Sequence, residues 1–158
     1  MLQNTVRDRI VNYIDNMRHW LRHRSLEREG DPQKRLEKRI WMEMTGAFLG
    51  GMASSGAWAS YKSRYYGNLT SEDDKKNARC MILSMLKSKK YSISDKAIIS
   101  YVCADLEIKE ALPEVNDLLQ RAKDSVYIKL YRLSQEALTT GMSVNELVDK
   151  KFKKGERM

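Results

Sequence analysis

Apolar residues recur every three or four positions in the first part of the chain. Between about Thr5 and Glu27 they form one stripe at successive spacings of 4, 3, 4 and 3: Val6, Ile10, Tyr13, Met17 and Trp20. That spacing places these side chains on one face of a helix, and its heptad-like form also suits a coiled-coil seam. Two interpretations stay open: a helix that packs on its own core, and a helix through which two copies of the chain form a homodimer.

A second helix is predicted after a break at Gly30. Asp31 suits the N-cap position and Pro32 suits the first helical position. The apolar positions that follow at helical spacing are Leu36, Ile40, Met44 and Ala47. The helix is expected to end near residues 50–51, two glycines. They lie in a Gly-, Ala-, Ser- and Met-rich stretch, residues 46–56, that suits either a close helix contact or a flexible joint.

Capping signals divide the rest of the chain into further helices. A Thr or a Ser at positions 70–71 precedes three acidic residues, which the positive end of a helix dipole favours. Ser94 precedes another apolar stripe and is expected to cap the next helix. We expect a helical pair over residues 1–56, for oligomerisation or partner contact, and a second helical region over residues 57–158.

The last third of the chain carries the clearest helix signals. Pro113 suits the first turn of a short helix, and a longer helix is predicted from about Lys123 to Leu138, ending at Gly141. Ser143 and Glu146 have the spacing of a capping box for a last helix.

Residues 125–133 alternate locally between polar and apolar side chains, as a strand would. Val126, Leu130 and Leu133 nevertheless fit a helix at spacings of 4 and 3. We therefore predict a helix for this segment, and an all-α, multi-helix fold for the chain.

The 158-residue chain is strongly basic. It has 29 Lys and Arg against 21 Asp and Glu, a formal net charge of +8, and an isoelectric point near 9.5. A positive field attracts polyanions and speeds their encounter with the protein. The densest excess runs from Lys62 to Lys90, although lysines at its end, such as Lys87 and Lys89, also suit the negative end of a helix.

No stretch of the sequence has the roughly 18 consecutive apolar residues of a membrane span, and the N-terminus lacks the apolar core of a secretory signal. The two cysteines, Cys80 and Cys103, form no metal-ligand spacing and no disulfide framework. We expect a soluble cytoplasmic protein with no membrane partner.

The sequence offers little for catalysis. His19 and His23 stand four apart on a predicted helix with Glu27 four further on, a spacing that can align three metal ligands. Arginines crowd the same helix, so we expect exposed helix histidines and no metal site. With no Gly-rich phosphate loop and no nucleophile–base set, the sequence predicts no enzyme activity and no cofactor.

An aromatic and basic cluster lies between the second and third predicted helices. Tyr61, Lys62, Arg64 and Tyr65 interleave side chains that can stack on bases with side chains that can pair with phosphates. A tyrosine-rich segment packed on the helices is the alternative interpretation.

Residues 114–133 have the pattern of a helix-turn-helix. Val115 and Leu119 share a face of the first short helix, and Val126 and Leu130 share a face of the second. Two short helices spaced in this way can cross and share a core, which leaves the outer face of the second free to enter a major groove.

The segment EVNDLLQRAKDSVYIKLYRL resembles the helix-turn-helix of the sigma-factor region-4 family. That family has apolar residues where Val115, Leu119 and Val126 stand, and this chain departs from it at Asn116, Gln120 and Arg121. The resemblance implies a transcription regulator whose helical DNA-binding region is residues 57–158. Small phage regulators such as the lambdoid Q-type late antiterminators have a similar size, charge and arrangement. This likeness implies action together with RNA polymerase, in the cytoplasm of a bacterial or phage-infected cell.

A helix-turn-helix would give its polar residues separate roles. The start of the recognition helix would face base edges, with Lys123, Asp124, Ser125 and Tyr127. Lys129 and Arg132 would contact phosphates or bases further along, and Arg121 in the turn would contact the DNA backbone. Phosphate contacts set affinity and salt dependence, whereas base contacts set specificity.

Two alternatives remain. The segment GMSVNELVDKKFKKG also resembles part of the ribbon-helix-helix repressors, which read DNA with a strand, and residues 125–133 would have to be that strand. The second alternative is a helical protein-interaction module that binds polyanions without sequence preference.

Overall fold

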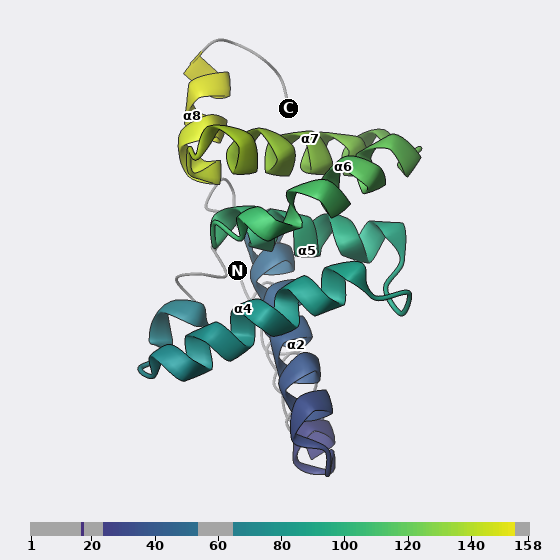
Figure 1. The fold of residues 1–158 in the computed structure, drawn as a ribbon, viewed down its shortest axis with the longest axis vertical. Coiled ribbons are helices and arrows are strands. Elements are labelled where there is room, and N and C mark those ends of the chain that lie inside the picture. The colour runs from purple at the N-terminus through teal and green to yellow at the C-terminus, as the bar shows by residue number, and fades with distance from the viewer. Residues whose placement is uncertain (1–16, 18–23, 54–64, 154–158) are drawn as a thin grey trace, which may run out of the picture. The chain divides into compact units, whose positions relative to one another are not determined.

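The computed structural model describes residues 17, 24–53 and 65–153 (Figure 1). Within these ranges the regular structure is entirely helical, with no strand, and this confirms the predicted all-α fold. The α-helices are α2 (Pro32–Ala53), α4 (Glu72–Lys87), α5 (Ile93–Asp105), α6 (Leu112–Arg121), α7 (Ser125–Thr140) and α8 (Val144–Lys153). Two short 3-10 helices, η1 (Tyr66–Asn68) and η2 (Lys109–Ala111), lie between them.

The chain divides into two compact units, Met1–Met42 and Glu43–Met158. The division falls inside α2, before the boundary at residue 56 that the sequence predicts.

In the first unit, α2 begins as predicted. The Asp31 Oδ1 atom accepts hydrogen bonds from the backbone N–H groups of Gln33 and Lys34, at 2.8 and 3.3 Å, and Pro32 is the first helical residue. The predicted dimer stripe lies outside the described residues except for Met17, which is 44% exposed.

The helix α2 continues past the two glycines at which the sequence predicts its end, and reaches Ala53. A methyl group added at Gly46 would meet nothing within 4 Å among the described residues. Among the described residues, therefore, no neighbouring helix comes close enough to Gly46 to require a glycine there. The remaining residues of the Gly- and Ser-rich stretch, 54–56, lie outside the described ranges.

In the second unit, α5 is the central helix. It packs against α4, α7, α8 and η2, and α7 also packs against α6 and α8. The residues of α5 that are buried occupy all sides of the helix: Lys96, Ala97, Ile99, Ser100, Tyr101, Val102, Cys103 and Ala104. Burial on all sides explains why α5 has almost no amphipathic pattern in the sequence.

Capping residues fix where the helices begin. The Ser71 side chain caps α4, in agreement with the prediction, by accepting a hydrogen bond from the Asp74 N–H. The prediction that Ser94 caps α5 is wrong, because Ser92 does so. The hydroxyl of Ser92 accepts from the Asp95 N–H at 3.1 Å, while the Asp95 carboxylate accepts from the Ser92 N–H at 3.1 Å. This reciprocal pair satisfies two free helix donors, which a cap at Ser94 could not do.

The end of α7 and the start of α8 follow their predicted signals. Gly141 takes a left-handed conformation with φ of +72°, and its N–H donates to the Ala137 carbonyl at 2.9 Å. Ser143 and Glu146 form the predicted capping box at the start of α8.

Candidate nucleic-acid interface

The helices α6 and α7 and the three residues between them have the order of a helix-turn-helix. Val115 and Leu118 of α6 are fully buried, and α7 packs along α6. A hydrogen bond of 2.7 Å from Gln135 Nε2 to Asn116 Oδ1 joins the two helices. The inner face of α6 therefore centres on Leu118, while the predicted contact residue Leu119 is only half-buried.

The prediction that Val126 shares the core of the helix pair is wrong, because its side chain is 58% exposed. Val126 lies in the first turn of α7, two residues after the N-cap Asp124. Helical spacing predicts which face of α7 carries Val126. It does not predict whether a neighbouring helix extends far enough along α7 to cover that side chain. The buried residues of α7 begin at Leu130.

The outer face of α7 carries exposed polar and basic side chains. Ser125, Lys129 and Arg132 are exposed, whereas the next residues around the helix, Tyr127 and Ile128, are half-buried. Because residues three and four apart share a helix face, the exposed group forms one stripe opposite the buried side of α7.

Two of the predicted contact residues already have partners within the protein. Asp124 is the N-cap of α7, and its Oδ1 atom accepts a hydrogen bond from the Val126 N–H at 2.8 Å. Arg121 forms an ion pair of 3.0 Å with Asp117, one helical turn earlier on α6. Both side chains of that pair are more than half exposed, so it contributes only about 0.3–0.5 kcal/mol and can exchange for a stronger partner.

Four helix ends meet at one edge of the second unit. The end of α4, the start of α5, the end of α6 and the start of α7 lie together, at the right of Figure 1. The Tyr131 hydroxyl joins α7 to the start of α5 by donating a 2.5 Å hydrogen bond to the Ile93 carbonyl. Burial of the ring raises the pKa of Tyr131 above its ordinary value.

A cleft opens at this edge between the α4–α5 connection and α6. Four of its lining side chains are cationic, from Lys87, Lys89, Lys96 and Arg121. Only Arg121 is among the predicted contact residues, so sequence reasoning missed most of this cluster. The lysines were visible in the sequence, but their convergence with α6 depends on how the helices pack.

Several candidate residues cannot be placed. Tyr61, Lys62 and Arg64 lie outside the described residues, as do His19 and His23. Tyr65 is described and has only 7% of its surface exposed, which leaves its ring little face for stacking on a base. The packing alternative describes Tyr65 better.

The described residues contain no group of three or more His, Cys, Asp or Glu side chains that could hold a metal ion. Within the same ranges, no helix is long and apolar enough to cross a bilayer.

Comparison with known proteins gives no relative: no family model, no curated protein and no solved structure matches the chain.

Proposed function

We propose that the protein is a sequence-specific DNA-binding regulator of transcription that inserts the outer face of α7 into a major groove. The observation that carries this proposal is the exposed stripe of Ser125, Lys129 and Arg132, on a helix whose opposite face is buried against α5 and α6. A helix that is held on one side and polar on the other can present donors to base edges without losing its own packing.

The basic side chains in the turn before α7 and on its outer face support the same proposal. Lys123 is exposed in the turn before α7, and Lys129 and Arg132 follow on the stripe. Arg132 can form a bidentate contact with guanine, whereas Lys123 and Lys129 suit phosphates. Asp124 serves as the helix cap, so the proposed interface no longer includes it as a base-reading residue.

The resemblance to sigma-factor region 4 supports a narrower form of the proposal. The protein would act with RNA polymerase, as a late-gene regulator or antiterminator of the phage type. The exposed Val126 at the start of α7 offers an apolar contact for a thymine methyl group.

A specific observation also favours the alternative, a helical interaction module that binds polyanions without sequence preference. Tyr127 and Ile128 are both half-buried, which leaves few side chains on α7 for reading bases. The ribbon-helix-helix alternative is wrong, because the segment that would supply its strand, residues 125–133, is helical.

Selection from a pool of random duplex DNA separates the two functions. The wild-type chain is compared with Lys129→Ala/Arg132→Ala and with Lys109→Ala/Lys150→Ala, a control that removes the same charge from exposed positions in η2 and α8. We expect the wild type and the control to enrich one defined site and the first variant to lose it. Equal binding by all three without enrichment would establish the alternative.

A further inference from the structure

The basic cleft at the edge of the second unit is a concave site of about 440 Å³. Lys87 and Lys89 lie on the α4–α5 side of it, and Lys96 reaches it from the first turns of α5. Arg121 comes from the end of α6. Its size falls in the range in which proteins bind discrete chemical groups, rather than that of a flat charged surface.

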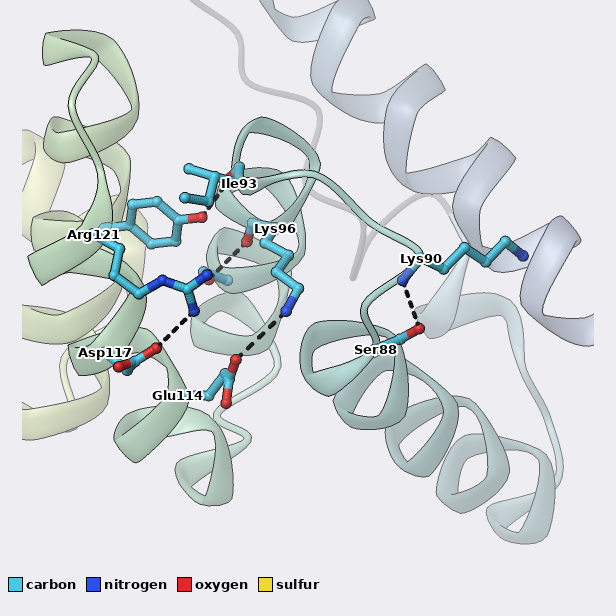
Figure 2. Close-up of polar contacts among 9 residues, drawn as sticks. Ser88, Lys90, Ile93, Lys96, Glu114, Asp117 and Arg121 are labelled. Atoms are coloured by element: carbon cyan, nitrogen blue, oxygen red, sulfur yellow. Dashed lines mark hydrogen bonds and ion pairs between the residues drawn. The ribbon is translucent and has the colours of Figure 1, made fainter.

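The cations of the cleft are poorly balanced by acidic groups. Among the lining residues one carboxylate, Glu114, faces four cationic side chains. The Lys96 ammonium lies 3.5 Å from Glu114 Oε1, a long ion pair that Figure 2 shows. Within the part of the chain that the structure describes, neither Lys87 nor Lys89 forms an ion pair.

Burial makes the imbalance significant. Lys96 has only 8% of its surface exposed, so packing holds its side chain at the cleft beside Glu114. An ammonium held in place in this way loses little conformational freedom when it binds an anion. Tyr91 lines the same cleft.

We propose that this cleft binds a phosphate group, and that the phosphate belongs to the backbone of the DNA that α7 reads. This inference rests on the proposed function. Arg121 connects the two surfaces, because it lines the cleft and also ends the helix before the turn. Its exposed partner Asp117 can be exchanged for a phosphate oxygen, with which a guanidinium forms shorter, charge-assisted bonds.

The contact adds affinity and fixes orientation without reading sequence. A phosphodiester seated between the lysines and Arg121 would set the angle at which α7 enters the groove. The cleft therefore contributes to the salt dependence of binding, whereas Arg132 contributes to site preference.

The test uses the full chain with Lys87→Gln/Lys89→Gln, two substitutions at exposed positions that remove the charge, keep a polar side chain and leave Lys96 in place. Affinity for one duplex is measured over a series of salt concentrations, and Lys109→Gln/Lys150→Gln is the control. We expect the cleft variant to bind more weakly with a salt slope lower by about 1, the value for one lost phosphate contact, and to enrich the same site as the wild type. An unchanged affinity and slope would overturn the backbone assignment.

A second arm keeps the cleft and the proposed function separable. Inorganic phosphate is titrated into the wild type and the cleft variant, and the amide resonances of Lys96 and Arg121 are followed. Resonance shifts that appear in the wild type and not in the variant support a phosphate site. If the wild type shows these shifts but binds no duplex, the proposed function fails and the cleft takes a free phosphate ligand. The absence of shifts in the wild type, together with unchanged DNA binding by the variant, would overturn the phosphate site.

Discussion

The two faces of α7 differ in almost every property. The inner face holds Leu130, Tyr131 and Leu133 against α5 and α6, and each of these side chains is at most 9% exposed. The outer face holds Lys129 and Arg132 in contact with solvent. The comparison teaches that one helix can hold the domain together and still present a charged surface, so stability and binding should respond to different substitutions.

The largest expected effect is in the buried core of the second unit, which includes the inner face of α7. Ile99→Ala in α5 removes a fully buried side chain and should lower the free energy of unfolding by about 2–5 kcal/mol, measured by urea denaturation. Lys129→Ala, on the outer face, should change it by no more than about 0.5 kcal/mol. A large loss of stability in the lysine variant would show that the two faces are not independent.

The C-terminal end of α7 should come next. Gly141 adopts φ of +72°, which is strained for any residue with a Cβ, so Gly141→Ala should cost about 1–2 kcal/mol. Gly30→Ala is the matched control, because Gly30 has no such backbone conformation and an added methyl group there meets no described residue within 4 Å. Equal thermal midpoints for the two variants would contradict the assignment of Gly141 as the helix stop.

Tyr131, on the inner face of α7, is hydrogen-bonded to the start of α5 beside the basic cleft. Tyr131→Phe removes the hydrogen bond to the Ile93 carbonyl and should cost about 1 kcal/mol, whereas Tyr127→Phe should be close to neutral. Because the folded protein raises the pKa of Tyr131, it holds that proton more tightly than the unfolded chain does. Wild-type stability should therefore fall as the pH rises above about 10, and less steeply in Tyr131→Phe. Parallel pH curves for the two proteins would show that Tyr131 is not responsible.

The smallest effect is expected at α8. Hydrogen bonds from Ser143 lower the pKa of Glu146. The unfolded chain therefore binds this proton more tightly, and the stabilisation is present above the ordinary pKa of Glu and is lost as the pH falls through the folded value. Glu146→Gln should make stability vary less with pH between about 5 and 3, as judged by thermal melts. Ser143→Ala should have a smaller effect, because alanine keeps the backbone N–H that donates to Glu146 and removes only the hydroxyl. A wild-type profile in Glu146→Gln would contradict the capping role.

Local signals in the sequence were sufficient for most of the fold. Asp31, Pro113, Gly141 and the Ser143 capping box mark helix ends through short-range chemistry, so they could be predicted without knowing the packing. Ser94 failed because two serines compete for one cap, and only Ser92 has an acidic residue three positions later.

The candidate site was only partly predictable. The spacing of Lys129 and Arg132 places them on one face of α7, and the exposure of both agrees with that pattern. Val126 was misplaced because the extent of the neighbouring helices is a tertiary property. The basic cleft was missed for the same reason. Lys96 and Arg121 line the same cleft only because of the way in which the helices pack.

The most direct test of the account is amide hydrogen exchange of the full chain with and without duplex DNA. If the outer face of α7 is the DNA-binding surface, exchange should slow in residues 121–132, where the turn and the first half of α7 lie, and remain unchanged in α8. Protection that gathers on α8, or exchange that is the same with and without DNA, would contradict the claim that α7 presents the binding surface.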